Sequence, residues 1–249
     1  MKPAVLLTVL AATLGTPALA QSSLGLTGAV LSFGQDDGTG AGAFGTVAGD
    51  FAITEHHGIQ FDLGLEETRA GTIGTAGAHL YMTPQAGQKY GIFAAVGDMD
   101  GRSATYGLLG AEGIFAVAPR TALEVRGGVG VASQSSLDFL FVEGDLYHDL
   151  TDDLSVHGGL TLAEFDEIGL SATGYEARLG VTYKPEGQPW GVFAEVARDG
   201  LHGLTGDAPV TSVRVGVSFE FGNTRRGGPA SRPFRAPDPV GSLLRRDMF

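Results

Sequence analysis

Apolar and polar residues alternate in about twelve stretches of the chain, and these stretches are separated by breaks rich in Gly, Pro and Asp. In the clearest stretch, Val213, Val215 and Val217 alternate with Arg214 and Gly216. Successive side chains of a β-strand point to opposite faces, so such a strand has one apolar and one polar face. The alternation predicts strands near residues 24–33, 42–54, 57–67, 71–82, 88–98, 103–117, 121–132, 137–148, 153–163, 173–184, 189–198 and 210–221.

The lengths of these strands match the thickness of a membrane. A tilted strand crosses the hydrocarbon core with about ten residues, and alternation of apolar and polar positions is typical of transmembrane β-barrels. An even number of strands allows closure, which removes unpaired backbone groups from lipid. We therefore expect an all-β fold, an antiparallel transmembrane β-barrel of about twelve strands, with eight to ten strands as alternatives and a soluble β-sandwich as the competing fold.

The N-terminal residues have the features of a cleavable signal peptide. Lys2 precedes an apolar run over residues 5–12, and Ala18-Leu19-Ala20 has the small-residue pattern of a cleavage site. The apolar run is too short for a membrane anchor, and the absence of cysteine excludes lipid attachment and disulfides. The sequence thus predicts a signal peptide at 1–20, a barrel at 21–222 and a tail at 223–249, with export to the bacterial outer membrane.

Charge divides the mature chain into two parts. Residues 21–222 contain nine Lys or Arg against 26 Asp or Glu, whereas residues 223–249 contain six Arg and two Asp. An acidic barrel argues against nucleic acid as a partner. It favours cations as solutes, or divalent ions that bridge to anionic lipids such as lipopolysaccharide.

The tail is rich in proline as well as arginine. Pro229, Pro233, Pro237 and Pro239 oppose both helix and strand, so we expect a disordered, basic, periplasmic tail. One alternative is that the basic tail folds into the acidic lumen, or across its periplasmic mouth, as a plug. A second alternative is attachment to the cell wall or to a periplasmic partner.

If the apolar positions face lipid, the opposite positions face the lumen. The register is ambiguous in residues 42–54 and 103–117, because a shift of one residue inverts every assignment. The predicted lumen-lining residues are Asp62, Glu66, His79, Glu112, Glu124, Arg126, Glu143, Asp145, His157, Glu176, Arg178, Glu195, Arg214 and Glu220.

Three functions are compatible with such a lumen. A surplus of carboxylates can line a porin-like channel for passive diffusion of small solutes, with a preference for cations. Alternatively, ion-pair networks can fill the lumen, and the barrel then serves envelope structure or surface interaction. Twelve strands do not decide between the two, since eight strands enclose little more than side chains and sixteen leave an open channel.

The third function is hydrolysis by Ser155 and His157, which share one face of a strand. Their orienting partner would come from neighbouring strands, as Glu143, Asp145 or Glu176. No nucleophile motif surrounds Ser155, so we expect no enzymatic activity. We also expect no cofactor and no metal site, since the adjacent His56 and His57 point in opposite directions in an extended chain.

The whole mature region resembles the Gram-negative outer-membrane β-barrel proteins of the small porin-like group. In that family the last strand ends in Phe, with apolar residues at every second position before it. Here the matching residues are Val213, Val215, Val217, Phe219 and Phe221. The resemblance implies recognition by the barrel assembly machinery and residence in the outer membrane, but it indicates neither the solute nor the oligomeric state.

The chain departs from the family pattern because 28 residues follow Phe221. The chain does end in Phe249, but residues 243–248 do not alternate as a strand would. We therefore place the assembly signal at Phe221.

Overall fold

The computed structural model describes residues 25–38, 42–68, 71–100, 104–133, 137–167, 170–203, 208–222, 229–246 and 248. The expected signal peptide at residues 1–20 lies outside the described residues.

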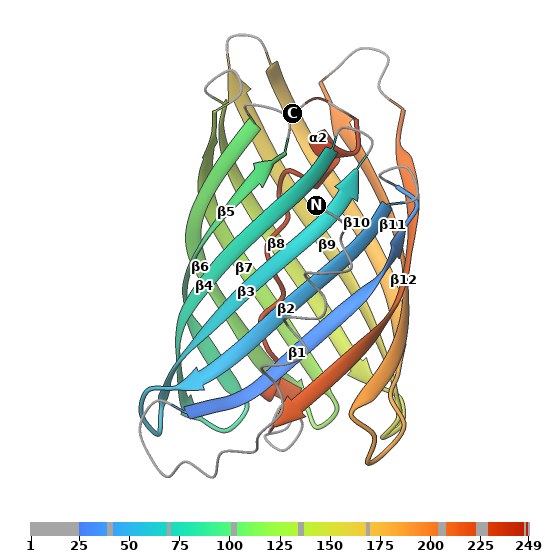
Figure 1. Cartoon of the computed structure of the whole chain (residues 1–249). Coiled ribbons are helices and arrows are strands. Elements are labelled where there is room, and N and C mark those ends of the chain that lie inside the picture. Colours follow the sequence, from blue (N-terminus) through green and yellow to red (C-terminus); the bar gives the residue numbers. More distant parts are fainter. Residues whose placement is uncertain are drawn as a thin grey trace.

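Twelve antiparallel strands form one closed barrel, in which each strand pairs with its neighbours in sequence (Figure 1). The first and last strands pair from Gly28 opposite Gly222 to Asp36 opposite Arg214, so the described strands leave no open edge. This arrangement confirms the expected all-β, twelve-stranded barrel. The strands are β1 (Gly25–Asp36), β2 (Gly42–Ala52), β3 (His57–Thr68), β4 (Gly71–Gln85), β5 (Gln88–Met99), β6 (Ala104–Ala118), β7 (Thr121–Ala132), β8 (Leu137–Asp149), β9 (Leu154–Glu167), β10 (Leu170–Tyr183), β11 (Trp190–His202) and β12 (Val210–Gly222).

The barrel has two distinct ends. The turn end holds Gly25, Gly222 and the hairpin turns at 53–56, 86–87, 119–120, 150–153 and 184–189. The loop end holds the other six connections. Strands β9 and β10 extend further toward the loop end than the predicted ranges 153–163 and 173–184, so most of the predicted loop between them is strand.

The alternation does not predict these strand residues because the apolar and polar positions exchange faces there. At the loop end of β9, Phe165 is buried inside the barrel, whereas Glu164 and Asp166 are exposed outside. A strand with polar residues on its outer face does not match the pattern of a lipid-facing strand. The predicted strand therefore ends before the observed one.

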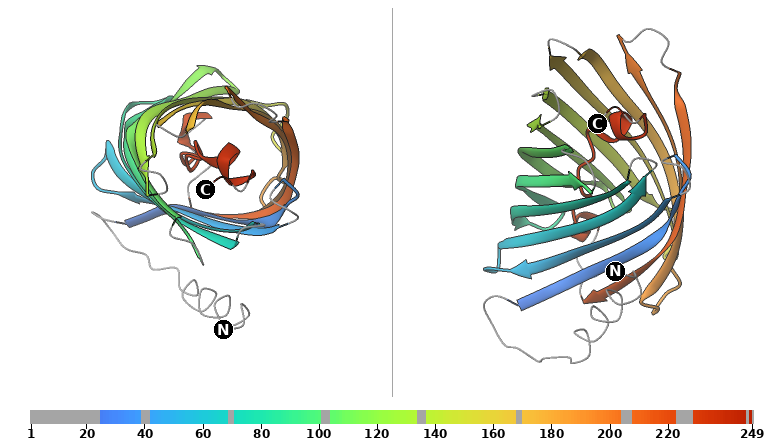
Figure 2. Two further views of the ribbon diagram at one scale, coloured as in Figure 1. Left: turned by 90° about the horizontal axis from the view of Figure 1, so that it is seen from above. Right: turned by 45° about the horizontal axis from the view of Figure 1, so that its top comes forward.

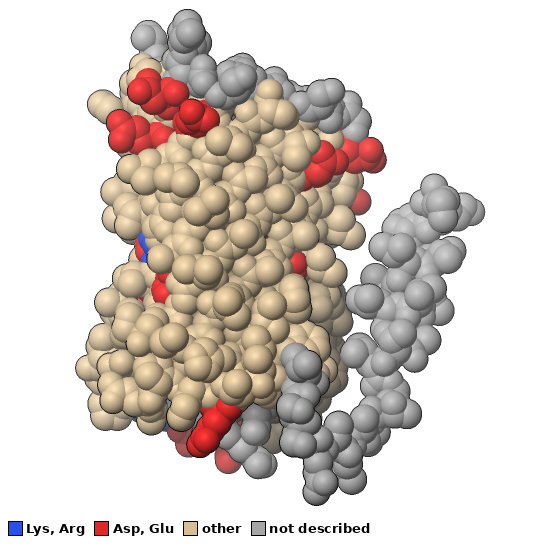
Figure 3. All heavy atoms as spheres, turned by 90° about the vertical axis from the view of Figure 1, so that its left-hand side faces the viewer, with Lys and Arg blue, Asp and Glu red and all other residues tan. Residues whose placement is uncertain are grey.

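The outer surface is apolar along most of the strands. Leu63, Ile92, Leu109 and Leu179 are among its most exposed side chains. On the face shown in Figure 3, Asp and Glu gather mainly near the two ends and leave a broad, mostly uncharged band between them. Such a band is typical of a barrel surrounded by lipid.

The interior contains an apolar cluster in addition to polar groups. Toward the loop end, Phe139, Phe141 and Phe165 are buried together with Val240 and Leu243. The latter two belong to the C-terminal tail, which contains a 3-10 turn, η2 (Pro229–Ser231), and a short helix, α2 (Gly241–Leu244). Within the described residues, no helix has the length and apolar character needed to cross a membrane.

Strand β6 shows why its register was ambiguous. Its inward positions include Tyr106, Leu108 and Ile114 as well as Glu112, and all four are buried. Apolar residues therefore occupy both faces of this strand. The interior residues pack against the apolar cluster and the tail, a feature that alternation alone does not predict.

Two glycines of β6 provide a matched test of packing inside the wall. A Cβ at Gly110 would fall on the carbonyl oxygen of Gly127 and within 2.8 Å of the Phe93 ring, whereas a Cβ at Gly107 has its nearest neighbour at 3.9 Å. We expect Gly110→Ala to destabilise the barrel by about 1–3 kcal/mol, since overpacking forces its neighbours to move, and Gly107→Ala to be tolerated. The measurement is the temperature at which the folded band disappears on SDS gels, and equal temperatures for the two variants would contradict the packing.

Candidate functional site: the barrel lumen

The described part of the C-terminal tail, residues 229–246, runs through the lumen from the turn end to the loop end (Figures 1 and 2). Near the turn end, Ala230 packs against Ile114 and Ala122, which flank the turn between β6 and β7. At the other end, Leu243 lies in the apolar cluster. This differs from the disordered periplasmic tail expected above and corresponds to the alternative in which the tail enters the lumen.

Proline limits regular structure in the tail but does not prevent contacts with the wall. Apart from η2 and α2, the described tail is irregular, as proline predicts. It is held by side chains of the inner wall, and these partners are distant in sequence from the tail. Composition alone therefore underestimates the order of this segment.

The inner wall of the described strands is strongly acidic. It carries twelve carboxylates: Asp36, Asp50, Asp62, Glu66, Glu112, Glu124, Glu143, Asp145, Glu176, Glu195, Asp199 and Glu220. It carries five basic side chains: Lys89, Arg126, Arg178, Lys184 and Arg214. The described tail adds four arginines, Arg232, Arg235, Arg245 and Arg246. The wall and the tail therefore have complementary charges.

Arg178 is the centre of the largest ion-pair network. Its Nε and Nη2 donate to the two carboxylate oxygens of Asp145 at 2.9 and 2.6 Å. Its Nη1 donates to Thr161 at 2.9 Å and to Glu176 at 3.2 Å, and Nη2 also donates to Glu143. The guanidinium thus holds three carboxylates in place inside the barrel, as a planar, five-donor group can.

A second network lies on β2 to β6. Both ring nitrogens of His79 lie 2.6 Å from a carboxylate oxygen, one from Asp62 and the other from Glu112. Lys89 lies 3.5 Å from Asp50, which also accepts a hydrogen bond from Tyr81 at 3.0 Å. These groups are packed into one side of the lumen.

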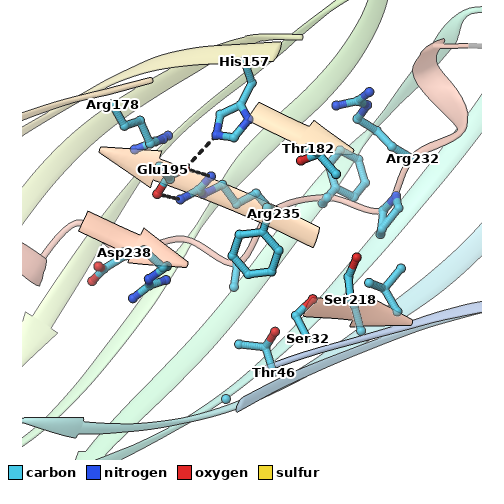
Figure 4. A pocket seen from close by; sticks show the side chains of 18 of the residues that line it. Ser32, Thr46, His157, Arg178, Thr182, Glu195, Ser218, Arg232, Arg235 and Asp238 are labelled. Atoms are coloured by element: carbon cyan, nitrogen blue, oxygen red, sulfur yellow. Dashed lines mark hydrogen bonds and ion pairs between the residues drawn. The ribbon is translucent and has the colours of Figure 1, made fainter. Parts of the chain in front are cut away.

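His157 has a different partner from those expected. Its Nε2 lies 2.7 Å from Glu195 of β11, and Glu195 also accepts two hydrogen bonds from Arg235 of the tail at 2.9 and 3.0 Å. Figure 4 shows this chain of contacts. Within the described part of the chain, no hydrogen bond joins Ser155 to His157, and the orienting carboxylate is Glu195 rather than Glu143, Asp145 or Glu176.

The structure places all fourteen predicted lumen residues on the inner face of the barrel. Nine are buried: Asp62, His79, Glu112, Glu124, Arg126, Glu143, Asp145, Arg178 and Glu195. The remaining five, Glu66, His157, Glu176, Arg214 and Glu220, are half-buried and line an open cavity.

Several residues of the inner face are not predicted by the alternation. Asp50 lies in a strand of ambiguous register, Lys89 lies at the start of β5, and Lys184 directly follows the end of β10. Asp36 and Asp199 lie beyond the predicted strand ends but belong to β1 and β11. Extension of the two-residue period from Arg214 or Glu195 into the neighbouring positions would have identified the inner face of these strand ends.

A cavity of about 880 Å³ occupies the part of the lumen that the tail leaves free. Its lining extends from Asp153, in a hairpin turn of the turn end, to Thr68 and Leu244 near the loop end. One side of it is formed by tail residues such as Arg235, and the other side by the hydroxyl groups of Ser32 and Ser218 and by other small polar residues (Figure 4).

The predicted assembly signal lies on the outer face of β12. Val213, Val215 and Phe221 are exposed, and Val217 and Phe219 are half-buried. Phe219 stacks on Phe33 of the neighbouring strand. Their role in assembly remains a prediction.

Metal ligation requires several donors that converge on one point. Within the described ranges, no group of three His, Asp or Glu side chains is arranged to hold a metal ion. The hydrogen-bonded carboxylates described above are instead occupied by Arg, Lys and His.

Comparison with known proteins identifies the fold. No protein-family model matches the chain, and no curated protein matches its sequence. Solved structures do match: the NanC porin has a TM-score of 0.57 and 11% identity and covers 77% of this chain and 98% of its own. The COG4313 outer membrane channel from Pseudomonas putida F1 has a TM-score of 0.55 and 14% identity and covers 83% and 99%.

A third structure, the KdgM porin in complex with disordered oligogalacturonate, has a TM-score of 0.53 and 12% identity and covers 78% of this chain and 99% of its own. At these identities the likeness concerns the fold. The chain is thus an outer-membrane-type, closed twelve-stranded β-barrel that resembles the small porin-like channels.

Proposed function

We propose that the protein is an outer-membrane channel for passive diffusion of small polar solutes. The observation that carries this proposal is the cavity beside the tail, whose lining includes residues from both ends of the barrel. A barrel filled by side chains alone would serve the rival function, envelope structure or surface interaction. The tail and the apolar cluster fill one side of the lumen. The cavity on the other side leaves room for the proposed diffusion.

The charge of the cavity favours cations and neutral solutes. Its lining includes twelve carboxylates, namely Asp36, Asp62, Glu66, Glu143, Asp149, Asp152, Asp153, Glu176, Glu186, Glu195, Glu220 and Asp238. It includes seven basic side chains, namely Arg120, Arg178, Lys184, Arg214, Arg232, Arg235 and Arg245. An excess of one sign along a pore raises the local concentration of the opposite ion.

The ion pairs in the cavity support this preference for cations, in addition to the larger number of carboxylates. Arg178, Arg214 and Arg235 are each engaged by carboxylates of the wall. The KdgM porin was solved with oligogalacturonate, a chain of carboxylate sugars. Such an anion would have to compete here with the carboxylates that already hold these arginines, so we propose a different solute class for this chain.

The proposed location also determines the partners. We propose that the apolar band contacts lipid and lipopolysaccharide, that the turn end faces the periplasm, and that the outer face of β12 is read by the barrel assembly machinery. The apolar exposed side chains and the shared end of Gly25 and Gly222 support this orientation.

The test is conductance of the purified protein in planar bilayers, after a heat-dependent shift on SDS gels has shown that it is folded. We expect discrete channels that prefer cations. Asp153 has a carboxylate oxygen without a hydrogen-bond partner among the described residues, and both Asp153 and Glu186 line the cavity. The double variant Asp153→Asn/Glu186→Gln should lower the cation-over-anion permeability ratio about twofold, because it removes two negative charges from the lining, of which that of exposed Glu186 is screened by water.

The matched control is Glu55→Gln, which removes an exposed carboxylate from another hairpin turn of the same end. Its permeability ratio should equal that of the wild type. Folded protein without any conductance would refute the channel and favour the structural barrel.

A further inference from the structure

The contacts between tail and wall converge on two consecutive tail residues, Phe234 and Arg235. The backbone N–H of Phe234 donates to the side-chain oxygen of Gln60 at 2.8 Å, and the side-chain amide of Gln60 donates to the carbonyl oxygen of Phe234 at 2.9 Å. Gln60 is fully buried and also donates to Asp62 at 2.8 Å. One wall side chain therefore satisfies both backbone groups of Phe234, as a neighbouring strand would.

The ring of Phe234 occupies an aromatic pocket in the wall. It stacks on His79 with centroids 5.5 Å apart and an interplanar angle of 9°, and it meets Tyr81 edge to face at 5.9 Å. The Lys89 ammonium lies 4.3 Å from the ring centroid. Phe234 is thereby almost entirely buried. A cation over the ring face and a stacked partner are specific contacts for an aromatic side chain.

Arg235 is bound through its backbone and its side chain. Its N–H donates to Glu124 at 3.0 Å, and its carbonyl oxygen accepts a hydrogen bond from Arg126. Its guanidinium donates to both oxygens of Glu195 at 2.9 and 3.0 Å. Bidentate pairing of this kind fixes the orientation of the side chain as well as its charge.

The same wall groups would lack partners without the tail. Gln60 would lose its partners for two hydrogen bonds, and Glu195 would keep only His157. Buried polar groups need such partners. We infer that the inner wall contains a peptide-binding site for an aromatic–arginine pair, and that the chain's own Phe234–Arg235 occupies it and holds the tail as a fixed constriction of the pore.

A second anchor lies at the loop end. Arg245 pairs with Glu176 and donates to Asp199 at 2.8 Å, and Arg246 also pairs with Asp199. Asp199 is fully buried. The tail is thus fixed at the middle and at one end of the lumen, and the cavity is what remains beside it. The inference deepens the proposed channel function and rests on it only for the electrical readout.

The test uses the full chain with the double variant Phe234→Ala/Arg235→Ala, which removes both side chains from the site. The control Arg232→Ala removes one positive charge from the same tail, where the guanidinium lies 3.8 Å from the centre of the Tyr147 ring, and it keeps the side chains of Phe234 and Arg235. A heat-dependent shift on SDS gels verifies folding of each protein. We expect single-channel conductance to rise at least twofold in the double variant and less in the control.

An independent readout is the accessibility of the tail. The chain has no cysteine, so Ala236→Cys introduces a single thiol beside the site. Both backgrounds also carry Arg245→Ala and Arg246→Ala, which remove the ion pairs of the second anchor. A maleimide carrying a polyethylene glycol chain too large for the lumen should react at least tenfold faster in the double-variant background than in the Arg232→Ala background. If the double variant does not fold, Gln60→Leu removes the two hydrogen bonds to Phe234 from the wall side and is tested in the same way.

The outcomes separate the two proposals. Faster labelling with increased conductance supports the peptide site and the constriction. Faster labelling without conductance in any folded variant supports the site and refutes the channel. Unchanged labelling overturns the inference, whether or not the wild type conducts.

Discussion

Replacement of Arg178 by alanine should destabilise the barrel by about 3–5 kcal/mol, because it removes the cation that three carboxylates share and takes from buried Asp145 the partner of its ion pair. Arg178 is 2% exposed, and it holds Glu143, Asp145 and Glu176. Mutual repulsion of these groups adds to their desolvation. The measurement is the urea midpoint of the protein in lipid vesicles, followed by the fluorescence of Trp190, the single tryptophan of the chain.

Arg120 provides the control for this change. It pairs with Asp152 in the hairpin turns, where the two side chains are 46% and 83% exposed. An exposed pair contributes about 0–1 kcal/mol, so Arg120→Ala should barely move the midpoint. Addition of Glu143→Gln and Asp145→Asn to Arg178→Ala should restore part of the loss. Equal midpoints for Arg178→Ala and Arg120→Ala would show that the network does not stabilise the fold.

Replacement of Leu109 by arginine should cost about 2–4 kcal/mol if lipid surrounds the barrel, since a charge at the middle of the bilayer is expensive. Leu109 is 61% exposed on the outer face of β6. Val117 on the same strand is 55% exposed but lies beside the hairpin turn. Val117→Arg should cost only about 0–1 kcal/mol near the interface.

The comparison of these two variants distinguishes a membrane barrel from a soluble one. In water, two outward positions of similar exposure would accept arginine equally well. The readout is again the urea midpoint in vesicles. An equal loss of stability in Leu109→Arg and Val117→Arg would argue that the apolar band does not contact lipid.

The sequence predicted the barrel well because a single rule, alternation, governs most of each strand. The rule failed at the loop end of β9, where Phe165 faces inward and Glu164 outward. It was ambiguous in β6, where Leu108 and Leu109 occupy opposite faces and are both apolar. At these places the inward side chains pack in the apolar cluster, together with Val240 and Leu243 of the tail. Alternation within a strand contains no information on these contacts.

The polar interior was predictable by position but not by pairing. The face that carries Glu143, Arg178 and Glu195 follows from the two-residue period. The partner of His157, by contrast, depends on how twelve strands place their side chains across the lumen, and on Arg235 of the tail. Nothing in the local sequence around His157 indicates Glu195, two strands further along the chain.

The path of the tail constrains the order of assembly. Pairing of β12 with β1 closes the barrel, and residues 229–246 lie inside it, from the turn end to the loop end. The barrel must therefore either close around this segment or admit it through the turn-end mouth afterwards. In the first order, the acidic wall is neutralised while the sheet curls, so the tail acts as a template for closure. In the second order, a domain that folds early behind residue 249 would be too wide to follow the tail into the lumen, and the tail could not enter.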